Sequence, residues 1–235
     1  MKIGLIPLKT IPGDPEANLQ HLRSRLLDVP PVDLICLPEC TLTGYVFDEL
    51  SLSRFSEPIP GPTVDEFSHF ARRHATFICF GLLELAEAKV YNSAVLLDRE
   101  GKIILKHRKI QEKPPFTMGS EVQTVNTKLR RISILICGDL FLEDARIKVG
   151  DADLLIVPMA RSFDGRSPDV DRWVSEERQA YLEAVAQIGL TTVIINALDQ
   201  NAKEGAFGGA MVVSAAGELL AESPHGSDDL LVYDL

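Results

Sequence analysis

The stretch Arg131-Ile132-Ser133-Ile134-Leu135-Ile136-Cys137-Gly138-Asp139 places a cysteine at the end of an apolar, β-branched run. Such a run predicts a buried strand over 131–137, and the Gly-Asp turn with the residues after it predicts the start of a helix. A strand that leads into a helix exposes a side chain above the sheet edge, directs free backbone N–H groups toward it and favours a thiolate. Cys137 is therefore a candidate nucleophile, although a cysteine that ends a strand is more often a small core residue.

Outward from this stretch, short apolar runs alternate with longer amphipathic segments along the whole chain. Strands are expected at 2–7, 34–38, 76–83, 90–97, 103–107, 131–137, 154–158, 192–196, 210–214 and 230–233. Helices are expected at 14–27, 63–74, 143–149 and 173–188. Turns at 98–102 and 215–218 join strands into two hairpins. These elements predict an α/β fold with mixed pairing, for which two face-to-face sheets flanked by helices suit the number of strands better than one open sheet.

Length, composition and net charge limit the kinds of protein that this sequence can encode. The chain has 235 residues, of which 46% are hydrophobic and 25% charged, as expected of one globular domain spanning 1–235. Its net charge of −10 argues against nucleic acid or an anionic membrane as a partner. No apolar run approaches the roughly 20 residues that span a bilayer, and no signal-peptide pattern follows Met1. These features predict a cytoplasmic protein that binds no membrane.

The four cysteines and five histidines lack the spacing of a metal site. We therefore expect no metal, no cofactor and no structural disulfide. Cys36 and Cys79 lie in apolar runs and are expected to be core residues, and Cys40 follows Glu39 directly. His107 is expected to be an edge residue rather than a catalytic base.

Three polar residues follow predicted strands: Glu39, Lys109 and Cys137. Individually, Glu39 also fits an ordinary charge at a strand exit, and Lys109 fits a solvated edge lysine. Together they suit one chemistry, because a thiol with a pKa of about 8.5 is poorly ionised at neutral pH and a neighbouring base helps it to attack. The lysine ammonium and the backbone N–H of Gly138 could then stabilise an oxyanion, which indicates acyl transfer through a thioester.

Four stretches, in the same order along the chain, resemble motifs of the nitrilase superfamily of carbon–nitrogen hydrolases. They are 37–45 around Glu39; 91–94 with 101–104 and 107–109; 136–140 around Cys137; and 208–213 with 216–218. The resemblance implies a four-layer αββα sandwich of two mixed sheets, a homodimer joined through helical faces, and no cofactor. It also implies Glu39 as general base, Lys109 as oxyanion stabiliser and Cys137 as nucleophile.

The same resemblance suggests further site residues. Glu112 is similar to a supporting glutamate of the family, with Glu121 as the alternative. Gly138 stands where the family often has an aromatic residue, so we expect more open space there. Tyr45 could contact substrate or pack in the core.

Two arginines follow the strand expected at 154–158. Arg161 or Arg166 could bind a substrate carboxylate or lie in solvent. The favoured substrate is a small linear amide of the ω-amide type. An N-carbamoyl compound, a nitrile, or a non-catalytic binding or regulatory role are the alternatives.

Overall fold

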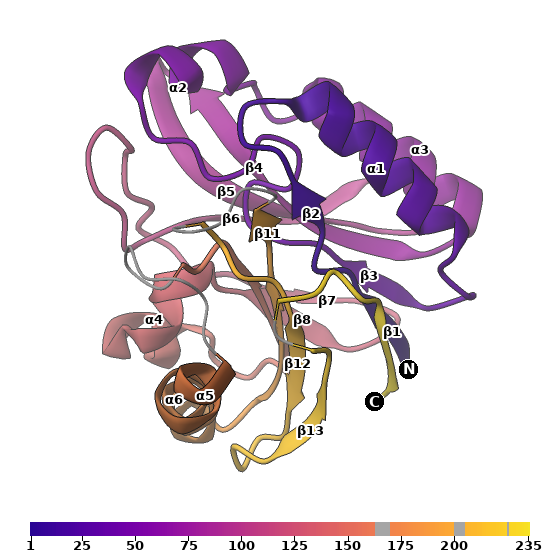
Figure 1. Ribbon diagram of the computed structural model, residues 1–235, viewed down its shortest axis with the longest axis vertical. Helices are drawn as coiled ribbons and strands as arrows, with labels where there is room; N and C mark the ends of the chain where they lie inside the picture. Colours follow the sequence, from indigo (N-terminus) through magenta and orange to yellow (C-terminus); the bar gives the residue numbers. More distant parts are fainter. Residues whose placement is uncertain (163–169, 200–204, 225) are drawn as a thin grey trace.

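Two six-stranded β-sheets lie face to face in the computed structural model, with helices on the outer side of each (Figure 1). The structure describes residues 1–162, 170–199, 205–224 and 226–235. The first sheet has the strand order β14 (Leu231–Asp234), β1 (Lys2–Leu5), β3 (Leu34–Cys36), β4 (Phe77–Ala86), β5 (Lys89–Leu97) and β6 (Ile103–Arg108). The second has the order β13 (Leu219–Glu222), β12 (Ala210–Val213), β10 (Thr191–Asn196), β9 (Leu154–Met159), β8 (Arg131–Ile134) and β7 (Thr124–Asn126). The short strands β2 (Lys9–Thr10) and β11 (Leu198–Asp199) form a separate pair.

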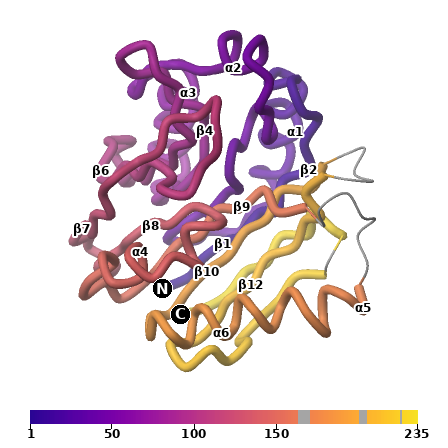
Figure 2. The backbone as a smooth tube through the Cα atoms, turned by 90° about the vertical axis from the view of Figure 1, so that its left-hand side faces the viewer, coloured from indigo at the N-terminus to yellow at the C-terminus, as the bar shows by residue number. Residues whose placement is uncertain are grey.

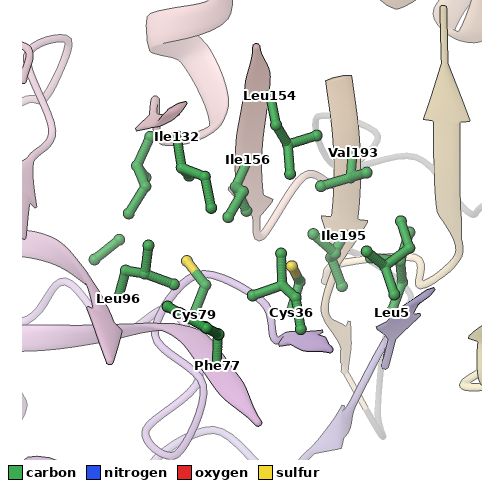
Figure 3. Packing of buried hydrophobic residues seen from close by; sticks show 14 of the residues in the cluster. Leu5, Cys36, Phe77, Cys79, Leu96, Ile132, Leu154, Ile156, Val193 and Ile195 are labelled. Carbon is green, nitrogen blue, oxygen red and sulfur yellow. The ribbon is translucent and has the colours of Figure 1, made fainter. Parts of the chain in front are cut away.

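The four layers form because successive apolar side chains of a strand point to opposite faces of the sheet. Along β3, Leu34 and Cys36 face the space between the sheets, whereas Ile35 packs toward the helices. Along β9, Leu154 and Ile156 face inward and the residues between them face outward. Figure 3 shows this inner layer, in which the side chains of both sheets meet. Since successive side chains of a strand point to opposite faces, an uninterrupted apolar run buries both.

The helices close the two outer layers. Helices α1 (Pro15–Leu27) and α3 (Pro62–His74) cover the first sheet, where Phe67 of α3 stacks on Phe80 of β4 with ring centroids 4.0 Å apart. Helices α4 (Glu143–Lys148) and α6 (Arg178–Ile188) cover the second sheet, with Val185 fully buried (Figure 2). The N- and C-terminal strands lie side by side, because β1 pairs antiparallel with β14. The predicted αββα fold class is confirmed.

Several predicted boundaries are wrong around the motifs. The strand expected over 131–137 ends at Ile134, and Cys137 instead begins a 3-10 helix that ends at Phe141. The ladder stops because the N–H of Ile136 turns to the side chain of Asp139. The helix expected at 173–188 starts earlier, with α5 (Val170–Arg172), and contains a π-helical turn over Trp173–Glu177. Helix α2 (Glu49–Phe55) was not predicted, because it buries a single apolar residue and gives little periodic signal.

The cysteines expected in the core lie there, and both Cys36 and Cys79 are fully buried between the sheets. His107 lies on the edge strand β6, as expected, and its side chain is buried. Within the described ranges, no helix is both long enough and apolar enough to cross a bilayer.

A buried carboxylate joins three strands of the first sheet. Glu84 of β4 accepts hydrogen bonds from Ser93 Oγ of β5 at 2.6 Å, and from Lys106 Nζ at 2.7 Å and Arg108 Nη2 at 2.7 Å of β6. Burial opposes ionisation of Glu84, but the hydrogen bonds from Arg108, Lys106 and Ser93 outweigh burial and lower its pKa to about 2. The charged form therefore stabilises the folded state.

We expect this stabilisation to depend on pH. It is present above the ordinary carboxyl pKa of 4.5 and is lost as the pH falls toward about 2. Urea unfolding should show Glu84→Gln less stable than the wild type by about 2 kcal/mol at pH 7, allowing for screening of the partly exposed cations, and by clearly less at pH 3. An equal difference at the two pH values would contradict this role.

Candidate active site

Glu39, Lys109 and Cys137 meet at one end of the sandwich. Glu39 follows β3, Lys109 follows β6 and Cys137 follows β8, so both sheets contribute. Lys109 Nζ lies 2.8 Å from Glu39 Oε1, and Lys109 and Cys137 line the same pocket. Glu39 is 1% exposed and Lys109 6% exposed, which excludes the reading of both as solvated surface charges.

The turn that carries Glu39 lies directly on β4. The N–H of Thr41 donates to the carbonyl of Gly81 at 2.9 Å, and the N–H of Gly81 donates to the carbonyl of Pro38 at 3.1 Å. A Cβ atom at position 81 would lie 2.7 Å from Glu39 Cα, which is closer than such atoms can approach. Glycine at 81 therefore allows the turn to pack against the strand and holds Glu39 above the sheet.

Three donors fix the Glu39 carboxylate. Oε1 accepts from Asn92 Nδ2 at 2.6 Å and from Lys109 Nζ at 2.8 Å, and Oε2 accepts from the backbone N–H of Ala160 at 2.8 Å. Asn92 is a site residue that the sequence reasoning missed. The sequence did contain a clue to Asn92, because a polar residue within the apolar run of β5 needs a buried hydrogen-bond partner.

A second carboxylate brackets the lysine. Glu112 Oε2 lies 3.3 Å from Lys109 Nζ, and Glu112 also accepts from Asn92 Nδ2 at 3.0 Å and from the Tyr45 hydroxyl at 2.9 Å. Burial disfavours the charged Lys109, but Glu39, the Cys137 sulfur and Glu112 outweigh burial and raise its pKa above the ordinary value. Lys109 is thus held as an ammonium. The alternative glutamate, Glu121, is exposed and contacts Gln123 instead.

Cys137 occupies a strained turn with φ of 49°, in the left-handed region that favours glycine. Burial of the sulfur and the Glu39 charge raise the thiol pKa to about 12, against the lowering effect of Lys109 and the Ala160 N–H. A 3-10 helix of five residues at Cys137 does not outweigh this burial, so its N-terminus has little effect on the thiol pKa. Cys137 carries a thiol that needs a base.

The other cysteines differ from Cys137 in burial. All four lie in the described part of the chain, and Cys36, Cys40 and Cys79 are buried, whereas Cys137 is partly exposed. Burial also raises the thiol pKa of Cys36, Cys40 and Cys79. Cys137 is thus the cysteine with access to a ligand.

A pocket of about 470 Å³ opens above Cys137. Its lining consists of Tyr45, Phe47, Lys109, Gln111, Glu112, Lys113, Pro114, Phe116, Cys137 and Gly138. The open space expected beside Gly138 is partly filled, because Gln111 Oε1 lies 2.9 Å from the place where a Cβ of residue 138 would be. Gly138 and Gln111 are thus complementary in size.

The remaining candidates are placed less centrally. Tyr45 forms part of the pocket wall, with its ring 5.3 Å from Lys109 Nζ, and it also packs against a buried cluster that contains Phe116. Arg161 is partly buried and lies 3.3 Å from Glu177, while its backbone N–H donates to Asn196 Oδ1 at 2.7 Å. Arg166 lies outside the described residues.

The site combines three chemical capacities. It has a protonated thiol beside a carboxylate that could accept the proton, and an ammonium that could stabilise a developing oxyanion. Among the described residues, His, Cys, Asp and Glu side chains form no group that could hold a metal ion.

Comparison with known proteins agrees with these features. The sequence matches the carbon-nitrogen hydrolase family over residues 2–235. It is 27% identical to an (R)-stereoselective amidase of Pseudomonas sp over 236 residues, covering 98% of this chain and 82% of that protein. It is 25% identical to the omega-amidase NIT3 of Saccharomyces cerevisiae over 254 residues, covering 97% of this chain and 84% of that protein.

Solved structures share the fold. An amidase from Nesterenkonia sp. superimposes with a TM-score of 0.81 at 22% identity, covering 100% of this chain and 90% of that one. Saccharomyces cerevisiae Nit3, a member of branch 10 of the nitrilase superfamily, gives a TM-score of 0.83 at 21% identity, covering 99% of this chain and 89% of that one. The implied nitrilase-like architecture is confirmed.

Proposed function

Because this chain belongs to the carbon–nitrogen hydrolase family, we propose that it hydrolyses small linear amides through a thioester on Cys137. The observation that carries the proposal is the buried contact of 2.8 Å between Lys109 Nζ and Glu39 Oε1 beside the Cys137 thiol. It supplies a base and an oxyanion stabiliser at one nucleophile.

The first half-reaction forms the thioester. Glu39 takes the thiol proton as Cys137 Sγ attacks the amide carbonyl, and the carbonyl oxygen becomes an oxyanion near Lys109 Nζ and the N–H of Gly138. Collapse of this intermediate breaks the C–N bond, and the proton held by Glu39 passes to the leaving nitrogen. Ammonia or an amine departs, and the acyl group stays on sulfur.

The second half-reaction releases the acid. Glu39 takes a proton from a water molecule that attacks the thioester carbonyl, and the thiolate leaves and recovers that proton. While Glu39 is protonated, Glu112 still pairs with Lys109 at 3.3 Å. The ammonium therefore keeps a counterion through both steps, which explains why two carboxylates bracket one lysine.

The pocket lining supports an ω-amide as substrate, meaning an amide with a carboxylate at its far end. Lys113 is exposed at the pocket wall, and its ammonium would suit a carboxylate held away from Cys137. Aromatic side chains of Tyr45, Phe47 and Phe116 also line the pocket and suit a short apolar spacer. An omega-amidase is also among the similar proteins.

We expect Lys113→Gln to raise KM for an ω-amide about fivefold and to leave kcat within twofold, because a solvent-exposed ionic hydrogen bond contributes about 1 kcal/mol. A neutral amide of the same length should be unaffected. Ammonia release measured with both substrates checks this, and Lys102→Gln, an exposed lysine outside the pocket lining, is the matched control. An equal change in KM for the two substrates would contradict the carboxylate-binding role.

The same assay separates the alternatives. An N-carbamoyl substrate would release carbon dioxide together with ammonia, and a nitrile would give ammonia without an amide being supplied. A non-catalytic binding or regulatory protein would release no ammonia from any of these compounds. Ammonia from an amide with no carbon dioxide is the result expected here.

A homodimer remains a prediction from the family resemblance. Exposed apolar side chains on the outer layer of the second sheet support it, with Phe141 43% and Ile147 71% exposed. Analytical ultracentrifugation should give about twice the 25.9 kDa mass of one chain. A mass of one chain at micromolar concentration would exclude a stable dimer.

A further inference from the structure

A buried hydrogen bond between a histidine and an aspartate lies beside the site and has no part in the proposed chemistry. His107 Nε2 is 2.9 Å from Asp139 Oδ2, and the two side chains are 2% and 0% exposed. Burial of two ionisable groups costs free energy unless their contacts are well formed. The position of the pair, two residues before Lys109 and two residues after Cys137, indicates what those contacts achieve.

Asp139 connects the turn of Cys137 with the chain on both sides of Lys109. Its Oδ1 accepts from the backbone N–H of Ile110 at 3.0 Å and of Gln111 at 2.8 Å. Its Oδ2 accepts from His107 Nε2 at 2.9 Å and from the N–H of Ile136 at 3.3 Å. One carboxylate therefore links the residue before Cys137 to residues before and after Lys109.

The turn needs this support, since Cys137 has a backbone conformation that a residue with a Cβ atom rarely adopts, with φ of 49°. The N–H of Ile136, directly before it, is held by Asp139, and the N–H of Asp139 donates in turn to the Ile136 carbonyl at 3.0 Å. These reciprocal contacts close the turn on both sides of Cys137 and Gly138.

We propose that Asp139, oriented by His107, is a positioning residue that fixes the Cys137 sulfur relative to Lys109 and Glu39. The proposal rests on the proposed function, because it concerns the same nucleophile. Displacement of a reacting group by about 1 Å can lower a rate as much as 10²-fold, so a pair that sets this distance has a large effect without touching substrate.

His107 contacts Asp139 through only one of its two ring nitrogens. His107 Nδ1 is buried and has no hydrogen-bond partner among the described residues, whereas Nε2 contacts Asp139. A glutamine at position 107 places an amide nitrogen near the Nε2 position and can still donate to Asp139. A phenylalanine keeps the ring volume and loses the donor. The two substitutions therefore separate hydrogen bonding from packing.

The test compares His107→Gln, His107→Phe and Asp139→Asn in the full-length protein. The readouts are the rate of Cys137 alkylation by iodoacetamide, followed by peptide mass spectrometry, and kcat and KM for an amide. We expect the Phe and Asn variants to lose about tenfold in alkylation rate and in kcat with KM within twofold, and the Gln variant to stay within about threefold of wild type. Glu57→Gln, which alters a partly buried carboxylate that contacts the N–H of Thr63 instead, should keep the wild-type alkylation rate.

Two results would overturn the proposal. The first is a wild-type alkylation rate and kcat in folded His107→Phe or Asp139→Asn, with folding checked by circular dichroism. The second is an equal loss in the Gln and Phe variants, because that pattern would indicate packing rather than the hydrogen bond. Should His107→Phe not fold, Asp139→Asn still tests the contact, because an amide keeps the volume of the carboxylate but cannot accept from both Ile136 N–H and His107 Nε2 through an N–H group. Alkylation needs no substrate, so failure of the proposed function appears separately, as wild-type protein that releases no ammonia.

Discussion

Replacing Cys137 by alanine should abolish amide hydrolysis, with a loss in kcat on the order of 10⁴-fold or more. The reason is chemical, because Glu39 and Lys109 remain in place but no atom can form the thioester. Ammonia release from an ω-amide measures the loss, and thermal unfolding measures whether the variant folds. Cys137 is a partly exposed residue and the substitution removes a single atom from its side chain, so we expect little change in stability.

Two other cysteines provide the controls for this result. Cys79→Ala removes a sulfur from the fully buried layer between the sheets and should cost about 1–2 kcal/mol of stability while kcat is retained. Cys40→Ala is the more stringent control, because Cys40 adjoins Glu39 and its sulfur lies 3.9 Å from Asn92 Oδ1. Turnover that persists in folded Cys137→Ala would contradict the assignment of Cys137 as the nucleophile. Loss of turnover in folded Cys79→Ala would contradict it as well.

Replacing Lys109 by alanine should lower kcat by about 10²-fold or more, since the oxyanion loses its ammonium. The same change leaves Glu39 and Glu112 buried without a cation, and breaking a buried pair costs about 3–5 kcal/mol. Rates must therefore be measured at a temperature where the variant is folded. Lys109→Arg retains the charge and should recover stability more fully than activity, because the guanidinium cannot occupy the same position as the ammonium.

One result would contradict the role of Lys109 in stabilising the oxyanion. A folded Lys109→Ala variant with kcat within tenfold of the wild type would show that another group stabilises the oxyanion. The backbone N–H of Gly138 would then be the remaining candidate of the two donors.

The sequence predicts the fold well because the deciding information is local. Apolar runs such as 34–38 and 154–158 are uninterrupted, as expected of strands buried on both faces, and both are strands in the structure with small changes at their ends. Glu39, Lys109 and Cys137 could be proposed because each ends such a run, where α/β folds place their functional side chains. Helix α2 escaped prediction because it has almost no buried face.

The supporting contacts could not be predicted because they join distant parts of the chain. Asn92 contacts Glu39 across 53 positions, and the N–H of Ala160 contacts it across 121. The contact of His107 with Asp139 joins β6 of the first sheet to the 3-10 helix that follows β8 of the second, so no local pattern indicates it. The thiol pKa of Cys137 likewise depends on burial and on the distant Glu39 rather than on the short helix that begins at this residue.

The most direct test of the thioester mechanism is to label the wild-type protein progressively with iodoacetamide and to measure Cys137 modification and ammonia release on the same samples. We expect ammonia release to fall in proportion to the fraction of Cys137 labelled and to reach background when labelling is complete, with buried Cys36, Cys40 and Cys79 unmodified. Undiminished ammonia release from protein whose Cys137 is fully alkylated would contradict the mechanism.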